Sequence, residues 1–222
     1  MAYELDFGAL SEYRGLLLEG TAVTLGLTAV SSVLGLALGV GGAAASLSKS
    51  VWLRLPAKAY VELIRNTPFI VQMFFVFFGL PAFGMRLSAI SAALLAMTIN
   101  VTAYAIEIFR AGIESVPGGQ MEAGRAIGMR PLLVFGLIVL PQAIGNVSPA
   151  LISQIIIVML ESAVVSQIAV VDLTHVGDLI QSRNFRAFET YFVITLIYLG
   201  LAIILRRLLV YATSSLRSGR TR

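Results

Sequence analysis

The chain has 222 residues, of which 58% are hydrophobic and only 13% are charged, and its net charge is +4. Soluble domains are about half apolar and a quarter charged, so these proportions argue against a soluble enzyme and against a disordered chain. The absence of cysteine excludes a disulfide scaffold, and a single histidine excludes a zinc site built from several histidines. A membrane-embedded protein is the class that these exclusions leave.

Five long stretches of the chain are nearly free of ionisable side chains. A helix needs about 20 mostly apolar residues to cross a bilayer. We therefore predict an all-α polytopic membrane protein, a single domain over residues 1–222. We expect Pro141 and Pro149 to break the fourth stretch, so that its span begins only at Gln142. The predicted spans lie at about 20–46, 66–84, 87–108, 142–160 and 187–210.

The distribution of Lys and Arg predicts the orientation of these spans. With the N-terminus outside and the C-terminus inside, twelve of the 16 basic residues face the cytoplasm, including Arg217, Arg220 and Arg222 in the tail. The four basic residues outside are Arg14, Arg86, Arg183 and Arg186. The positive-inside rule favours this orientation. The positive net charge then needs no nucleic-acid partner to explain it.

The first predicted span contains Gly35 and Gly39 in a GxxxG pattern, which allows close packing between helices. At the start of the second span, Glu62 and Arg65 are three residues apart and can pair on one helix face. We favour a simple interfacial position for that pair.

The third predicted span holds Asn100 and Glu107. Ionisable residues within a span are costly and usually face a cavity or a partner. Glu107 is therefore a candidate for a polar path through the bundle, although it can also pair with Arg110 at i,i+3 spacing.

Residues 111–130, between the third and fourth predicted spans, form a cytoplasmic loop in this orientation. After the break at Pro117, the segment from Gln120 to Ile127 is predicted to be a short helix, with Gly128 as its C-terminal cap. From Glu122 the chain reads Glu-Ala-Gly, three residues, Gly128, nine residues, and then Ile-Val-Leu-Pro ending at Pro141.

This spacing resembles the EAA motif of permeases from binding-protein-dependent ABC importers, in which Gly124 is usually Ala. Other stretches are similar to the polar amino acid branch of that family, and together the resemblance covers about residues 20–210. These stretches are Arg65-Asn66-Thr67-Pro68, Ala103-Tyr104, Arg110-Ala111-Gly112-Ile113 and Leu140-Pro141-Gln142-Ala143.

The resemblance implies a pore subunit of an amino acid importer in a bacterial inner membrane. In that family two permease subunits, identical or homologous, pair in the bilayer, and each sets its EAA helix into a groove on one of two ATPase subunits. A periplasmic or surface-tethered binding protein delivers the amino acid. No GxxxxGK[ST] sequence occurs, so we expect a chain that is not an enzyme and binds no cofactor, with ATP-Mg on the partner ATPase.

The resemblance assigns the ATPase contact to the predicted short helix. Small residues would let the partner approach closely. Glu122, in the first turn, would favour the helix dipole and bond to the ATPase or to Arg125. The assigned contact residues are Glu122, Ala123, Gly124, Arg125 and Gly128.

Near the end of the fourth span the chain resembles the family's Lys-Asp/Glu-Thr-Ser-Leu stretch. Leu160 and Ala163 replace the Lys and the Ser, which slightly favours a heterodimer whose other half holds more of the site. Glu161 would meet an ammonium group or a cationic side chain, and hydrogen-bonding groups would lie beside it. The candidates for the substrate path are Glu161, Ser162, Gln154, Glu107 and Asn100.

Asp172, His175 and Asp178 recur at three-residue spacing in the polar segment that follows. They suggest either a metal site or a helix lying along the outer interface, and we favour the helix. For the whole chain, a passive channel or a non-transporting membrane scaffold is the alternative. A membrane-embedded enzyme is less favoured because no GxSxG or HExxH occurs.

Overall fold

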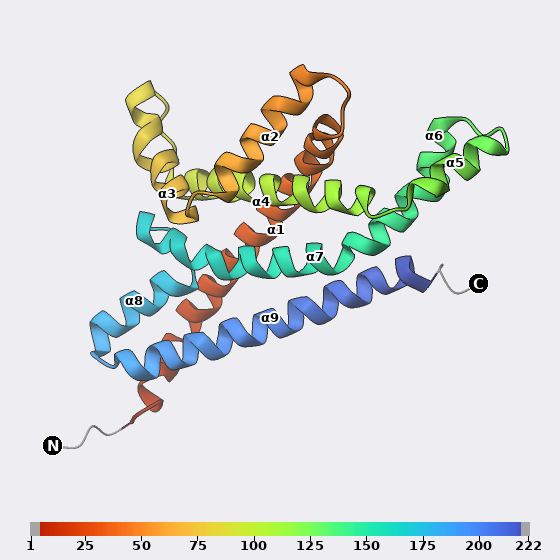
Figure 1. The fold of residues 1–222 in the computed structure, drawn as a ribbon. Coiled ribbons are helices and arrows are strands. Elements are labelled where there is room, and N and C mark those ends of the chain that lie inside the picture. Colours follow the sequence, from red (N-terminus) through yellow and green to blue (C-terminus); the bar gives the residue numbers. More distant parts are fainter. Residues whose placement is uncertain (1–4, 219–222) are drawn as a thin grey trace.

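The computed structural model describes residues 5–218, and the side chains of residues 5–214. Every regular element in this part of the chain is a helix, which confirms the all-α class (Figure 1). Arg220 and Arg222, which the sequence predicts to be cytoplasmic, lie outside the described residues, as does the side chain of Arg217. Within the described residues four helices are long and apolar enough to cross a membrane, or five if one bent pair counts as a span. The four are Gly8–Ser46, Ala89–Glu114, Pro131–Ile168 and Ala187–Ser214.

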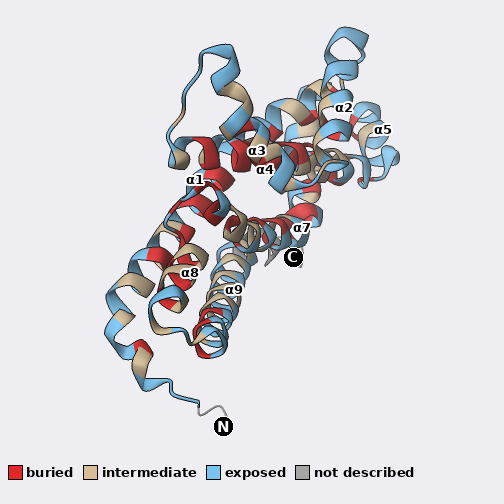
Figure 2. Cartoon of the chain, turned by 90° about the vertical axis from the view of Figure 1, so that its left-hand side faces the viewer, coloured by how far each residue is buried: buried red, intermediate tan, exposed pale blue. Residues whose placement is uncertain are grey.

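Helices α1 (Arg14–Ser46) and α4 (Ala89–Glu114) cross closely at the centre of the bundle. A Cβ atom at Gly35 would lie 2.6 Å from Val101, and one at Gly39 would lie 2.5 Å from Ala105. Only glycine permits backbones to approach this closely, so the close packing predicted from the GxxxG pattern is confirmed. Buried residues concentrate where these two helices meet α7 (Leu140–Glu161) (Figure 2).

The second predicted span differs from the structure. Helix α2 (Val51–Arg65) ends before Pro68, and α3 (Phe69–Phe74) continues through η2 (Phe75–Gly79) and η3 (Leu80–Phe83). The two halves are bent by 107°. Pro68 has an extended backbone (ψ 138°), and a proline disfavours helix at the residue before it, so the chain turns here. The segment 69–83 is too short to cross alone, and a crossing here needs α2 as well.

The expectation that Pro141 and Pro149 break the fourth stretch is wrong. Helical backbone runs without a gap through α6 (Pro131–Val134), η4 (Phe135–Val139), α7 and η5 (Ser162–Ile168). A wider π turn, η4, precedes Pro141 and accommodates its ring, and Pro149 lies within α7. A similar π turn, η2, precedes Pro81.

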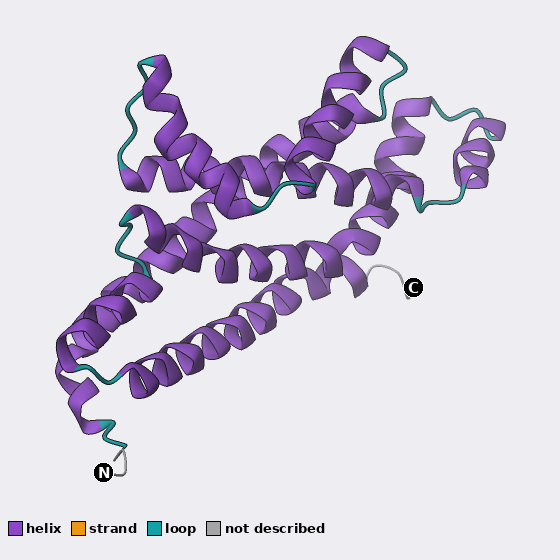
Figure 3. Cartoon of the chain, turned by 60° about the vertical axis from the view of Figure 1, so that its left-hand side comes forward, coloured by secondary structure: helices purple, strands orange, loops and turns teal. Residues whose placement is uncertain are grey.

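The remaining helices are η1 (Gly8–Tyr13), α5 (Gly118–Ala126), α8 (Leu173–Asn184) and α9 (Ala187–Ser218), and short loops connect the elements (Figure 3). Helices α5 and α6 and the C-terminal end of α9 lie at one end of the bundle, whereas α8 and the start of α1 lie at the other (Figure 1). We call these the α5 end and the α8 end. Only 6% of the apolar window of α9 is buried in this chain, which leaves its surface for lipid or another subunit.

Candidate functional site

Helix α5 stands outside the bundle and has a well-formed C-terminal cap. The N–H of Gly128 donates to the carbonyl of Arg125 (2.9 Å), and that of Met129 donates to Gly124 (3.1 Å). These are the two bonds of a Schellman motif, which needs a left-handed residue after the cap. Gly128 supplies it with φ 81°, so its predicted capping role is confirmed. The helix begins at Gly118, earlier than predicted. Glu122 therefore lies in the second turn of α5 and not in the first.

One face of α5 is anchored to its own chain. Gly124 is buried, and a Cβ there would lie 2.7 Å from the side chain of Val134 in α6. Met121 packs against a small cluster that contains Val116 and Val139. Gly124 therefore serves packing within the chain in this structure.

The other face of α5 is exposed. Glu122, Ala123 and Arg125 are all on the surface, and neither charged side chain forms an ion pair with any described residue. Of the two partners predicted for Glu122, the ATPase or Arg125, Arg125 forms no ion pair with it in the described part of the chain. Both charges are free to meet a protein that docks on this face.

The bend between α2 and α3 is held by a single amide side chain. Nε2 of Gln72 donates to the carbonyl oxygens of Ile64 (2.7 Å) and Thr67 (3.0 Å), and to Oγ1 of Thr67 (2.9 Å). Ile64 lies in the last turn of α2 and Thr67 just after it, where the helical pattern of N–H donors ends; the carbonyl of Ile64 also accepts from the N–H of Thr67 at 3.4 Å. Oε1 of Gln72 accepts from Nδ2 of Asn100 at 3.1 Å, which ties the bend to α4. This role of Gln72 is not among the sequence predictions, although a polar residue just after an X-Pro break is a signal for it.

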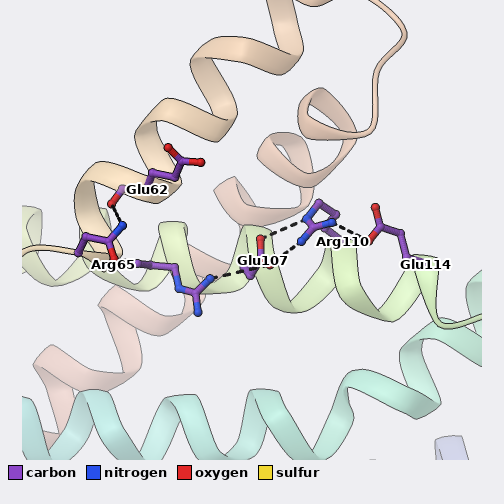
Figure 4. A network of polar contacts seen from close by, with 6 residues as sticks. Glu62, Arg65, Glu107, Arg110 and Glu114 are labelled. Carbon is purple, nitrogen blue, oxygen red and sulfur yellow. Dashed lines mark hydrogen bonds and ion pairs between the residues drawn. The ribbon is translucent and has the colours of Figure 1, made fainter.

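A chain of ion pairs runs from the same bend along the side of α4 that faces α1 and α2. Arg65 lies 3.9 Å from Glu107, Glu107 pairs with Arg110 at 2.5 Å, and Arg110 pairs with Glu114 at 2.6 Å (Figure 4). The predicted i,i+3 pair of Glu107 and Arg110 is therefore confirmed. The suggested pairing of Glu62 with Arg65 is wrong, because Arg65 turns to α4 and stacks over Tyr104 instead (5.3 Å).

These side chains border a polar pocket of about 400 Å³ between α1, α2 and α4. Basic side chains in its lining are Lys58, Arg65 and Arg110, and the acidic ones are Glu62 and Glu107. Asn100, although on the same helix as Glu107, is buried behind the bend and does not line this pocket. The pocket lies in the half of the bundle nearer the α5 end, since it includes Ser46 at the end of α1.

The candidates around the end of α7 have different environments. Glu161 is partly exposed and forms no ion pair with any described residue. Ser162 is fully buried, and its hydroxyl donates to the carbonyl of Met159 at 2.7 Å. Gln154 is also buried, and its Nε2 has no hydrogen-bond partner among the described residues.

The polar residues after α7 shape a helix. Asp172 caps α8 by accepting from the N–H of His175 (2.9 Å), and burial raises the pKa of Asp172 above its usual range. Asp178 accepts from the hydroxyl of Tyr191 in α9. Helix α8 packs on α1 and α9, so the predicted helical segment is confirmed, and two of its acidic residues have structural partners.

Comparisons with known proteins agree with this architecture. The family described as "Binding-protein-dependent transport system inner membrane component" matches residues 22–218. The chain is 35% identical over 201 residues to the octopine transport system permease protein OccM of Rhizobium radiobacter, covering 86% of this chain and 82% of that protein. It is 34% identical over 205 residues to the arginine transport system permease protein ArtQ of Bacillus subtilis, covering 90% and 92%.

Two solved structures have the same fold. A chain from the crystal structure of an amino acid ABC transporter with histidines superposes with a TM-score of 0.90 at 38% identity, covering 96% of this chain and all of that one. A chain of the MetNI methionine ABC transporter in an inward-facing conformation gives a TM-score of 0.73 at 22% identity, covering 95% and 99%, and shows similarity of fold alone.

Proposed function

Because the chain belongs to the family of binding-protein-dependent transport system inner membrane components, we propose that it forms the pore of an ATP-driven amino acid importer. It is a permease and not the catalytic subunit. ATP-Mg is bound and hydrolysed by two separate ATPase subunits, and this chain binds no cofactor. The names of the relatives, which include permeases for octopine and arginine, support amino acids and their derivatives as the substrate class.

Coupling to the ATPase takes place through α5. The observation that carries this proposal is the division of α5 into an anchored face, with Gly124 and Met121, and an exposed face with Glu122 and Arg125. A docked ATPase would contact the exposed face with Glu122, Ala123 and Arg125, while Gly128 ends the helix. Movement of the ATPase would then pass through the anchored face to α4 and α7, because packed elements move as rigid bodies.

A second permease subunit completes the pore. The surfaces of α2, α3 and α9 are apolar and exposed, which supports a partner subunit and lipid around this chain. The replacements at Leu160 and Ala163 favour a homologous partner over an identical one. The N-terminus lies outside and the C-terminus inside a bacterial inner membrane, with α5 in the cytoplasm and a periplasmic or surface-tethered binding protein at the α8 end.

The substrate path follows the polar groups of α4 and α7. Glu161, near the α8 end, is positioned for an ammonium group or a cationic side chain, and Glu107 lies near the α5 end. Oδ1 of Asn100 and Nε2 of Gln154 are buried without a partner among the described residues. Such atoms are costly to leave unpaired, which supports their use when the bundle opens. Ser162 would take part only if its bond to Met159 is exchanged for one to substrate.

The test begins with a pull-down of the tagged chain from mild detergent and identification of its partners. The assembled complex is then reconstituted in vesicles and supplied with ATP, the binding protein and radiolabelled amino acids. Uptake that needs both ATP and the binding protein is the expected result. Flux without nucleotide would support a passive channel instead, and recovery without any ATPase or flux would support a scaffold.

A further inference from the structure

The pocket between α1, α2 and α4 contains charged groups that keep hydrogen-bonding capacity beyond the ion-pair chain. Arg110 is engaged on both sides, since its Nε and Nη2 donate to Glu107 and its Nη1 donates to Glu114. Arg65, in contrast, is 3.9 Å from Glu107 and forms no hydrogen bond with a described residue. A guanidinium carries five N–H donors, so most of the donors of Arg65 remain available.

The orientation of Arg65 is nevertheless defined. Its guanidinium lies over the ring of Tyr104, 5.3 Å from the ring centre. Its Nη1 lies 3.9 Å from a carboxylate oxygen of Glu107 (Figure 4). Both partners belong to α4, whereas Arg65 is the last residue of α2. An arginine that is held by stacking, with free N–H groups, is suited to bidentate recognition of a carboxylate.

Two other charged residues, which do not belong to the ion-pair chain, line the pocket. Lys58 lies seven residues before Arg65 and therefore on the same face of α2, and Glu62 lies between them. Neither forms an ion pair with a described residue. The open N–H donors of Arg65, together with Lys58 and Glu62, thus offer two cations and one anion, which complement a ligand that carries carboxylate and ammonium groups. The two carboxylates of the lining, Glu62 and Glu107, would repel a phosphate dianion.

We propose that this pocket binds the α-carboxylate of an amino acid through Arg65, with Lys58 as a supporting charge. A volume of about 400 Å³ is in the range of ligand pockets and accommodates a single amino acid. The inference rests on the proposed importer function, because the pocket would be a binding site on the substrate path near the α5 end. Glu107 is then a positioning residue that orients Arg65, and Glu62 faces the ammonium group.

The test compares amino acids with their α-amides, which lack the negative charge. The purified complex of this chain and its ATPase, without binding protein, is first titrated with each standard amino acid. Each amino acid that binds is then compared with its α-amide, for example arginine with argininamide. We expect the wild type to prefer the acid by about 10- to 100-fold, the contribution of a charge-assisted hydrogen-bond pair.

The ratio of acid affinity to amide affinity, measured in variants, identifies the residue that recognises the α-carboxylate. Arg65→Gln should reduce the acid-to-amide preference to near one, and Arg65→Lys should retain part of it because the charge remains without the planar fork. Arg54→Gln is the matched control, since Arg54 lies on α2, is exposed and does not line the pocket. If Arg65→Gln does not assemble with the ATPase, Lys58→Gln replaces it and should give a smaller fall in the ratio.

Three results would overturn the pocket proposal: no binding of any standard amino acid at millimolar concentration, no acid preference in the wild type, or an unchanged preference in the pocket variants. Each of these leaves the importer function intact if the wild type still accumulates amino acids with ATP. Absence of ATP-driven uptake by the assembled wild type would instead refute the importer function itself.

Discussion

At the scale of single residues, amide side chains determine local geometry that the backbone cannot supply. Gln72 satisfies carbonyl groups at the end of α2 and joins the bend to Asn100 on α4. These hydrogen bonds are partly buried, and a buried carbonyl without a donor costs about 1–3 kcal/mol at most, so one side chain here affects several groups at once. A charged side chain can likewise hold two partners, because the carboxylate of Glu107 forms ion pairs with both Arg110 and Arg65.

Replacement of Gln72 should destabilise the bend. Gln72→Leu removes the donor for Ile64 and Thr67 and the acceptor for Asn100, and we expect a loss of about 2–3 kcal/mol in the free energy of unfolding. Gln167→Leu is the control, because Gln167 is exposed and its amide makes only a 3.4 Å contact. Unfolding in detergent measures both variants. Equal stabilities would contradict the role given to Gln72.

Glu161 is expected to affect substrate and not assembly. Glu161→Ala should weaken uptake of amino acids with a cationic side chain about 10-fold, or shift the substrate range, because no described residue shares the charge of Glu161. Glu19→Ala is the control on an exposed site of α1. Initial uptake rates across a panel of amino acids provide the measurement, and unchanged rates for all of them would remove Glu161 from the path.

At the scale of elements, the bundle depends on where two helices can approach. The glycines of α1 differ in this respect although their sequence surroundings are similar. Gly39 faces Ala105 on α4, whereas Gly41 has no atom within 4 Å of the position its Cβ would take. The GxxxG pattern therefore predicts the contact, but only the packed structure identifies the partner helix.

A single methyl group should distinguish these two glycines. Gly39→Ala places a Cβ 2.5 Å from that of Ala105 and should lower the free energy of unfolding by about 1–3 kcal/mol. Gly41→Ala should be neutral or stabilising by up to about 1 kcal/mol, because alanine is the better helix former. Melting temperatures in the same detergent compare them, and a similar fall in both would mean that α1 and α4 are packed differently.

Helix α5 offers a matching test of coupling. Glu122→Lys reverses an exposed charge without disturbing Gly124 or Met121, so the chain should still insert and fold. We expect ATP-driven uptake to fall at least about 10-fold, because a lost charge-assisted contact becomes a repulsion. Co-purification of the ATPase and uptake rate are measured together, with Glu12→Lys at the other end of the bundle as control. Normal uptake would refute the assignment of α5 as the coupling helix.

At the scale of the whole molecule, the described chain has its short helix α5 at one end and α8 at the other (Figure 1). Much of its apolar surface, notably on α2 and α9, is left uncovered by the chain itself. Such a surface is expected for a subunit that is completed by lipid and by a second permease.

The orientation in the membrane can be measured directly because the chain contains no cysteine. Arg86→Cys and Arg130→Cys each introduce one thiol at an exposed position between helices. With the N-terminus outside, a membrane-impermeant maleimide should label residue 86 in intact cells and residue 130 only after the membrane is opened. The opposite pattern would invert the proposed orientation.

The sequence by itself determined the helical class, the positions of most long helices, the short capped helix after Pro117 and the family resemblance. These follow from apolar run length, from glycine at a left-handed position and from fixed motif spacing, all of which are local along the chain. The packed structure was needed to show that the chain bends by 107° at Pro68 and that Pro141 and Pro149 do not interrupt the fourth predicted span. The same holds for the pairing of Arg65 with Glu107, for the inward face of Gly124 and for the pocket between α2 and α4. Each of these depends on which distant segment lies opposite, and spacing within one helix does not contain that information.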